Sequence, residues 1–142
     1  MKYLKFLDRE KMGSIFSKII SGEIPCHKVA ENETCFAFLD IAPLAVGHTL
    51  VVPKREVDKY FDLNDEEIAQ INIFSKTISS AIERTVTCKR IGVAVIGLEV
   101  PHAHIHLIPL NSIGDINFER TKLELSQDSL ADTARQIREA LG

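Results

Sequence analysis

Short apolar segments bounded by turn-forming residues predict five β-strands in this chain. We place them at residues 27–31, 34–39, 47–53, 91–96 and 102–108. The first two flank Asn32 and Glu33 and are expected to form a hairpin. After the second strand, the residues from Asp40 to Pro43 are expected to leave the sheet as a loop.

Apolar positions that recur three or four residues apart predict three helices. The longest covers residues 65–85, because Asn64 followed by Glu67 is a capping signature at its start. Its apolar face comprises Ile68, Ile71, Phe74, Ile78, Ala81 and Ile82. A short helix is expected between Ser14, as its N-cap, and Gly22. A third helix is expected over residues 128–141, with Leu130, Ala134, Ile137 and Leu141 on one face.

The order of these elements predicts one α+β domain over residues 13–142. We expect an antiparallel sheet arranged as a meander, one long helix on a face of it, and short N-terminal and C-terminal helices. The two strands after the long helix are short and close together, which suits a meander better than a parallel fold. Residues 1–12 are interpreted as an N-terminal extension that is too charged for a signal peptide. Met12 is a candidate start, in which case the preceding residues are an upstream reading or a flexible arm.

Composition narrows the class of protein. With 45% hydrophobic and 26% charged residues over 142 positions, the chain has the balance of a soluble globular domain. A net charge of −3 without a block of like charges disfavours nucleic acid or an anionic membrane as the main partner. The three cysteines form no Cys-x-x-Cys pair, so a reducing cytoplasm is the simplest location. No apolar run is long enough to predict a membrane span.

Histidines occupy every second position at the start of the last predicted strand. His102, His104 and His106 are three of the five histidines in the chain. Because side chains of an extended strand alternate between faces, the three share one face. The residues between them are apolar and fill the opposite face. A row of imidazoles backed by a core predicts a reaction surface.

Three interpretations of this row are open. A structural role explains a single histidine better than three in alternation. A metal site would use two imidazoles of a His-x-His pair, with His48 as a further ligand and an oxygen from Glu99. The outer two histidines of the row are too far apart to share one ion.

The third interpretation is nucleophilic catalysis. At pH 7 most histidine side chains with an unperturbed pKa are neutral. Neutral imidazole attacks phosphorus to give a covalent nucleotidyl-histidine. The central His104 would have an imidazole on each side to donate hydrogen bonds to phosphate oxygens or to protonate a leaving group. This arrangement explains why three histidines are present rather than two.

Several segments together resemble the histidine triad (HIT) superfamily. The histidine row over residues 102–108 has the form His-x-His-x-His-x-x, and three further blocks at residues 14–25, 36–43 and 47–54 follow the family pattern in order and spacing. The similarity extends over residues 14–110 and is nearest to the Hint-like and bacterial HIT branches.

The resemblance implies a nucleotide hydrolase or transferase that acts at the α-phosphate of purine nucleotide conjugates, with adenosine as the expected nucleoside. His104 would be the nucleophile and would carry a transient nucleotidyl adduct. The backbone carbonyl of His102 would hold the His104 ring in the required tautomer. His106 would contact the phosphate or the leaving group, with His48 nearby.

The resemblance also implies a nucleoside pocket. Asp40 corresponds to the carboxylate that accepts hydrogen bonds from the ribose hydroxyls, a role that suits an acceptor-only group. The apolar residues that match the base pocket are Phe16, Ile19, Phe38 and Ile41. Plain core packing would explain the same four residues, and a turn before Pro43 would explain Asp40.

Candidate substrates implied by the resemblance are adenosine phosphoramidates and dinucleoside polyphosphates. No cofactor is required, although Mg²⁺ is compatible with a polyphosphate substrate. A homodimer built around the long helix, with the sheet continued between subunits, is also implied. Two other functions stay open: a nucleotide-binding adaptor with weak or no catalysis, and a zinc-dependent hydrolase.

The chain departs from the family pattern just before the histidine row. Leu98 stands where a glutamine is expected, Glu99 where a hydroxyl residue is expected, and Ile96 near the position of an asparagine. An ionised Glu99 about 4 Å from a phosphate would cost on the order of 4 kcal/mol at an effective dielectric near 20. We therefore expect Glu99 to point away, to pair with His102 or another cation, or to act as an acid or base.

Two further departures limit the resemblance. Ser14 and Ser17 stand where several bacterial relatives carry a Cys-x-x-Cys pair that binds zinc with two histidines. Serine is a poor zinc ligand, so that zinc site is not expected, and a metal role for His48 and His102 is disfavoured. The chain also lacks tryptophan, so the leaving-group specificity of relatives with a tryptophan-containing tail does not carry over.

Overall fold

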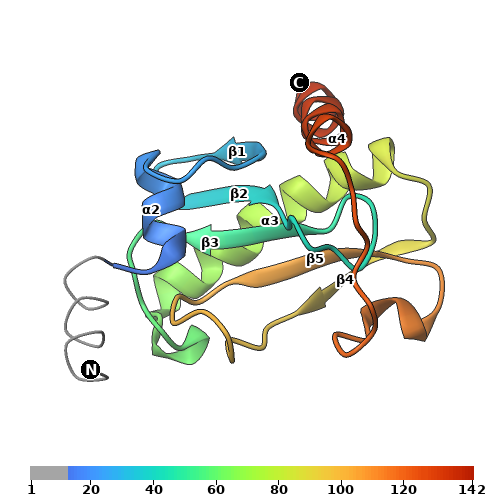
Figure 1. The fold of residues 1–142 in the computed structure, drawn as a ribbon. Coiled ribbons are helices and arrows are strands. Elements are labelled where there is room, and N and C mark those ends of the chain that lie inside the picture. Colours follow the sequence, from blue (N-terminus) through green and yellow to red (C-terminus); the bar gives the residue numbers. More distant parts are fainter. Residues whose placement is uncertain (1–12) are drawn as a thin grey trace, which may run out of the picture.

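The computed structural model describes residues 13–142, and its elements follow the predicted order (Figure 1). The extension expected at residues 1–12 lies outside the described residues. The helices are α2 (Ile15–Ser21), α3 (Asp65–Thr85) and α4 (Gln127–Leu141), and the strands are β1 (Lys28–Glu31), β2 (Cys35–Leu39), β3 (Thr49–Pro53), β4 (Arg90–Ala94) and β5 (Ile105–Leu110). Two short 3₁₀ turns, η1 (Tyr60–Asp62) and η2 (Ile113–Ile116), complete the set. None of the helices described has the length and apolar character to cross a membrane. The predicted α+β class is confirmed.

The five strands form one antiparallel sheet in the order β1-β2-β3-β5-β4. The first three strands form the predicted meander. After β3 the chain crosses the sheet through α3, enters at the far edge as β4, and returns as β5 between β4 and β3. This crossover refines the meander expected from strand spacing, and it places β5 inside the sheet with a partner strand on each side.

Capping residues mark the starts of α2 and α3 and the end of α2. At the start of α3, the Asn64 side chain accepts from the Glu67 N–H while the Glu67 carboxylate accepts from the Asn64 N–H, which is the predicted capping box. At the start of α2, the Ser14 hydroxyl accepts from the Ser17 N–H. Gly22 ends α2 in the left-handed region with φ 88°. Both helices therefore match their predicted limits.

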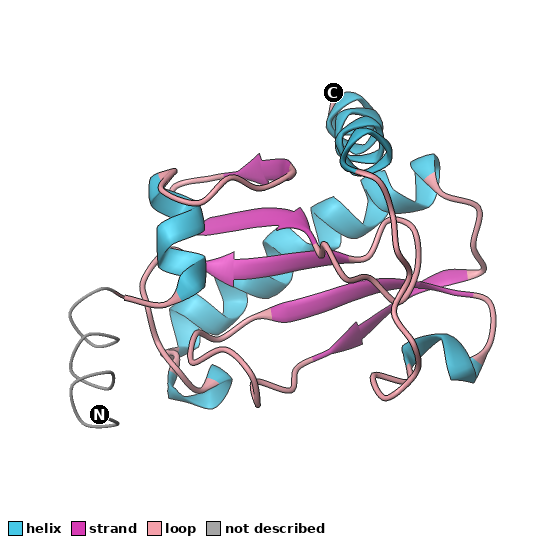
Figure 2. Ribbon diagram, viewed as in Figure 1, coloured by secondary structure: helices cyan, strands magenta, loops and turns pink. Residues whose placement is uncertain are grey.

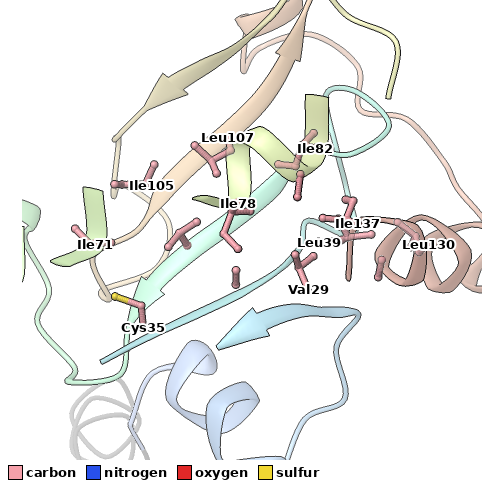
Figure 3. Packing of buried hydrophobic residues seen from close by; sticks show 14 residues of the cluster. Val29, Cys35, Leu39, Ile71, Ile78, Ile82, Ile105, Leu107, Leu130 and Ile137 are labelled. Atoms are coloured by element: carbon pink, nitrogen blue, oxygen red, sulfur yellow. The ribbon is translucent and has the colours of Figure 1, made fainter. Parts of the chain in front are cut away.

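One face of the sheet packs against α3 and α4. Odd-numbered positions of β2, β3 and β5 point to this face, and Figure 3 shows Ile105 and Leu107 of β5 in one cluster with Ile71, Ile78 and Ile82 of α3. The full cluster comprises Val29, Cys35, Ala37, Leu39, Val51, Ile71, Ile78, Ala81, Ile82, Ile105, Leu107, Leu130, Ala134 and Ile137. Burying an Ile or Leu side chain stabilises a fold by roughly 1.5–3 kcal/mol. These contacts therefore fix β5 firmly against α3.

The opposite face carries a smaller aromatic cluster and the histidines. Phe16 of α2 packs there on Phe36, Phe38, Leu50 and Val52. His106 lies beside Leu50 in the ladder between β5 and β3, and so points to the same face. The short helix α2 therefore covers one end of the face that α3 leaves free (Figure 1).

The strand that carries the histidines begins later than predicted. We expected it to cover residues 102–108, but β5 begins at Ile105, so only His106 belongs to it. Residues 102–104 precede the ladder, where His102 N–H bonds to the carbonyl of Val100 and Ala103 N–H bonds to that of Val57. The histidine row is thus part strand and part loop.

Candidate active site

Four histidines come together on the face of the sheet opposite α3. His102, His104, His106 and His48 are all buried, and none is more than 8% exposed. Neighbouring rings touch: the centroids of His104 and His106 are 4.9 Å apart, and those of His48 and His106 are 5.2 Å apart. Buried imidazoles need hydrogen-bond partners, and these partners assign a role to each ring nitrogen.

The His104 ring is oriented by the backbone of His102. His104 Nδ1 lies 2.7 Å from the carbonyl oxygen of His102. Because a carbonyl oxygen only accepts, Nδ1 carries the proton and donates, which leaves the lone pair of a neutral ring on Nε2. Phe16 packs edge-on against this ring at a centroid distance of 5.0 Å. The ring is therefore held in one orientation, with a lone pair on Nε2 that can act chemically as a nucleophile.

A second hydrogen-bonded pair joins His48 to His106. The Leu44 N–H donates to His48 Nδ1 at 3.0 Å, so a neutral His48 carries its proton on Nε2. That Nε2–H donates to His106 Nδ1 at 3.0 Å. His106 is left with its own proton on Nε2, where it is a hydrogen-bond donor.

Burial keeps these rings neutral. It lowers the pKa of His48 to about 4, with a further contribution from the positive charge of Lys122. Burial also lowers the pKa of His106 to about 3, and the neighbouring His104 and His48 add to the effect. The pKa values of His102 and His104 are likewise lowered, chiefly by burial. At pH 7 the site therefore presents neutral imidazoles rather than cations.

Asp40 lies at the edge of the His48–His106 pair. One carboxylate oxygen is 3.6 Å from His48 Nε2, and the other accepts from the Ala42 N–H at 2.9 Å. Burial raises the pKa of Asp40, whereas the Ala42 hydrogen bond and the Lys122 charge partly offset that rise. Its side chain is 22% exposed, so a ligand can still reach the carboxylate.

Asp40, His48 and His106 are also close enough to be considered as metal ligands. One ligand atom from each lies within 4.8 Å of the others. Coordination through His48 Nε2 would require the proton of a neutral ring on Nδ1, but that nitrogen already accepts from the Leu44 N–H. The arrangement therefore suits a hydrogen-bonded pair better than a metal site. Glu99, the oxygen ligand considered from the sequence, is not among these three groups.

The structure brings together three of the four residues matched to a base pocket. Phe16 and Phe38 touch with ring centroids 5.5 Å apart, and Ile19 packs at the edge of the same cluster. Ile41 stands apart, because its side chain is 66% exposed and does not join that cluster. Any contact of Ile41 with a base would therefore be made at the surface.

Glu99 lies on the loop that leads into the histidine row. It lines a cavity of about 860 Å³ between this loop and α2. Its negative charge makes a small contribution that raises the pKa of both Asp40 and His104. The pairing with His102 considered from the sequence is not formed, since both nitrogens of that ring are bonded elsewhere.

Sequence reasoning missed a segment that crosses the site between η2 and α4 (Figure 2). The ring of Phe118 lies 4.7 Å from that of His106, and the ammonium of Lys122 lies 5.8 Å from the Phe118 ring centroid. Arg120 ties the segment down by donating to the carbonyl of Leu44 at 2.6 Å. A single aromatic residue in a polar loop without periodicity gives no signal that would have identified this contact.

A sequence model of the HIT domain matches residues 21–113, which is more than half of the chain. The chain belongs to the HIT family. This HIT protein is 36% identical over 131 residues to an uncharacterised HIT-like protein of Borreliella burgdorferi, covering 87% of this chain and 94% of that one. It is 42% identical over 100 residues to the adenosine 5′-monophosphoramidase hnt1 of Schizosaccharomyces pombe, covering 69% and 74% of the two chains.

A solved structure supports the same fold for this HIT protein. It superposes on the crystal structure of a Hit-like protein from Bartonella henselae with a TM-score of 0.78 and 29% identity. The match covers 90% of this chain and 96% of that one. The strand order and the helix positions described above are therefore those of HIT structures.

Burial of neutral histidines predicts that acid destabilises the protein. In the unfolded chain His48 takes up a proton below its ordinary pKa of 6.5, but in the folded protein it does so only below its lowered pKa of about 4. Between these values the unfolded state binds more protons, so the free energy of unfolding falls by about 3 kcal/mol for this one group as the pH is lowered. When the free energy of unfolding is measured by urea titration across this pH range, it should depend less steeply on pH in His48→Asn than in the parent protein. The surface variant His27→Asn is the control, and equal slopes for His48→Asn and the parent would contradict the assignment.

Proposed function

We propose that this HIT protein hydrolyses adenosine nucleotide conjugates at the α-phosphate through a nucleotidyl adduct on His104. The observation that carries this proposal is the bond from His104 Nδ1 to the carbonyl of His102, which leaves Nε2 unprotonated. A lowered pKa keeps the ring neutral at pH 7. A neutral, oriented imidazole is the form that attacks phosphorus.

The reaction takes two steps. His104 Nε2 attacks the α-phosphorus and forms an N–P bond, while the bond from phosphorus to the leaving group breaks. The electron pair departs with the leaving group, which takes up a proton from solvent. Water then attacks phosphorus, the N–P bond breaks, and the proton lost by that water returns to solvent. His104 is regenerated as a neutral ring.

Neighbouring groups support both steps. The Nε2–H of His106 would donate to a phosphate oxygen and stabilise the charge that develops there. The carbonyl of His102 would stabilise the positive charge on the His104 ring of the adduct through the bond from Nδ1. Asp40 would accept hydrogen bonds from the ribose hydroxyls, and the Phe16–Phe38 cluster would contact the base.

Phosphoramidates of adenosine are the preferred substrate class in this proposal, and dinucleoside polyphosphates are the second. The name of the Schizosaccharomyces pombe relative, an adenosine 5′-monophosphoramidase, supports this order. The negative charge of Glu99 near His104 also favours a substrate with fewer phosphates. The attack itself requires no cofactor, and Mg²⁺ would enter only with a polyphosphate.

We also propose that the protein forms a homodimer through the β4 edge of the sheet. Val93 of β4 lies opposite Leu107 in the ladder and so points to the α3 side, yet it is 60% exposed. Ile73 on α3 is 68% exposed. Among residues 13–142, β4 pairs with β5 alone, so its outer edge is free. A second copy can cover such an edge, and the exposed apolar side chains beside it, by continuing the sheet.

Replacement of the nucleophile should separate chemistry from binding. His104→Ala is expected to abolish turnover of adenosine 5′-phosphoramidate, because no other ring nitrogen has the same orientation, while nucleotide binding by calorimetry stays measurable. Rapid quenching of the parent protein with labelled substrate should trap the label on His104. His27→Ala is the control. Full activity of His104→Ala would contradict the mechanism, and a parent protein without adduct or turnover on phosphoramidate, diadenosine polyphosphate or nucleotide sugar would point to a binding protein.

Neutralising Glu99 should assist the reaction with anionic substrates. Glu99→Gln removes a charge that opposes the phosphate, and at an exposed position this is expected to raise kcat/KM by roughly two- to fivefold. The gain should be larger for a diadenosine polyphosphate than for the phosphoramidate. Glu33→Gln, a change at an exposed position in the turn between β1 and β2, is the control. A fall in kcat/KM would instead identify Glu99 as an acid or base in the reaction.

The dimer is testable by light scattering after size-exclusion chromatography. The parent protein is expected to have twice the mass of one chain, and Val93→Asp should shift it to one chain mass, because a carboxylate at this edge would be buried without a partner. Ile113→Asp alters a residue that is exposed elsewhere on the surface and should leave the mass unchanged. A parent protein of one chain mass at micromolar concentration would contradict the proposed dimer.

A further inference from the structure

A hydrogen-bonded cluster outside the reacting groups joins α2 to the start of the histidine row. The hydroxyl of Ser14 lies 2.7 Å from His102 Nδ1, and both residues are buried. The carboxylate of Glu56 accepts from the Ser14 N–H and, at 2.8 Å, from the Ser17 hydroxyl. Ser14, Ser17, Glu56 and His102 thus form one connected cluster, which we call the Ser14 cluster.

The donors and acceptors of this cluster assign one tautomer to His102. His102 Nε2 lies 2.8 Å from the carbonyl oxygen of Pro53, so Nε2 carries the proton and donates. Burial lowers the pKa of His102, so Nδ1 of the neutral ring holds a lone pair and accepts from the Ser14 hydroxyl. The same hydroxyl oxygen accepts from the Ser17 N–H at 3.0 Å.

Glu56 keeps the two serines in this arrangement. Burial alone would raise its pKa, but the hydrogen bonds from the Ser14 N–H and the Ser17 hydroxyl outweigh that effect and lower the pKa overall. Glu56 therefore stays ionised as an acceptor at pH 7. It accepts hydrogen bonds from the backbone N–H of Ser14 and from the side-chain hydroxyl of Ser17. The backbone N–H of Ser17 in turn donates to the Ser14 hydroxyl oxygen.

The position of His102 explains why such an anchor is needed. Residues 102–104 precede β5, so the ladder of the sheet does not fix their backbone. The His102 ring is instead held from two sides, by the end of β3 at Pro53 and by the start of α2 at Ser14. The carbonyl that orients His104 belongs to this same residue.

We propose that Ser14, Ser17 and Glu56 are positioning residues for the nucleophile. They hold His102 as the Nε2–H tautomer, and so hold its carbonyl on Nδ1 of His104. The kinetic consequence rests on the proposed function, whereas the effect on the two rings does not. Ser14 is thus both the N-cap of α2 and the partner of a buried histidine.

The first test reads the ring tautomers directly in the free protein. Long-range ¹⁵N–¹H spectra of the parent should show His102 as the Nε2–H form and His104 as the Nδ1–H form. Ser14→Ala should give mixed tautomers for both rings. Ser126→Ala removes the N-cap of α4 in the same way but contacts no histidine, so it should leave both rings unchanged. Unchanged tautomers in Ser14→Ala would overturn the proposal.

The second test separates helix capping from the effect on His102. Ser14→Asp keeps a good N-cap but cannot donate to Nδ1, so α2 should persist while His102 shifts to a form protonated on Nδ1. A misplaced nucleophile should lower kcat by about 10- to 100-fold with KM changed little. Ser14→Thr, which keeps the hydroxyl, should recover the parent tautomers and most of kcat. A loss of kcat in Ser14→Asp no larger than in Ser126→Ala would overturn the proposal.

Glu56→Ala tests the outer part of the cluster. It removes the acceptor of Ser14 and Ser17, so partial mixing of the His102 tautomers and a kcat between those of Ser126→Ala and Ser14→Asp are expected. Tautomer spectra of Glu56→Ala identical to those of the parent would show that Glu56 is not a positioning residue. If the parent turns over no nucleotide while its tautomers respond as described, the proposed function fails and the positioning role stands.

Discussion

The hydrogen bond between His104 Nδ1 and the carbonyl of His102 is the constraint on which the site depends. It fixes the ring orientation, and it decides which nitrogen holds the lone pair. A solvent-exposed imidazole would exchange between tautomers and rotate. Here the residue is 7% exposed and its ring packs against Phe16, so the bond at Nδ1 holds the ring in place and leaves Nε2 free. The orientation of the ring and the position of its lone pair therefore have a single structural cause.

Burial of four imidazoles is tolerable only because each is neutral and bonded. A buried polar atom without a partner costs about 1–3 kcal/mol, and a buried unpaired charge costs more. The Leu44 N–H, the Pro53 carbonyl and the Ser14 hydroxyl supply partners from three different parts of the chain. The apolar core behind β5 holds these parts in register. The stability of the fold and the protonation of the site are thus linked.

Much of this arrangement could be predicted from sequence, because local rules decided it. The capping box at Asn64 and Glu67 gave both the start and the type of α3. Alternation of polar and apolar residues placed the histidines and the core on opposite faces. Resemblance to the HIT family supplied the role of the His102 carbonyl, and the geometry agrees with it.

The rest depended on contacts between segments that are distant in sequence. The start of β5 was placed three residues early, because the pattern of alternation continues through residues 102–104 although the ladder does not. Ser14 reads as a helix cap in the sequence, and nothing local indicates that its hydroxyl also bonds a histidine 88 positions later. Phe118 could not be predicted for the same reason. Such contacts follow from the crossover of α3 and from the segment that returns over the site.

The charge balance of the site follows from these same contacts. Neutral histidines supply donors but no positive charge, and the loop before them contributes the negative Glu99. The cation that acts on the site from the returning segment is Lys122, whose charge lowers the pKa of both His48 and Asp40. An anionic substrate would therefore be stabilised by oriented neutral donors more than by opposite charge. Such donors need no reorganisation as charge develops on a bound group, and their strength increases where water is excluded.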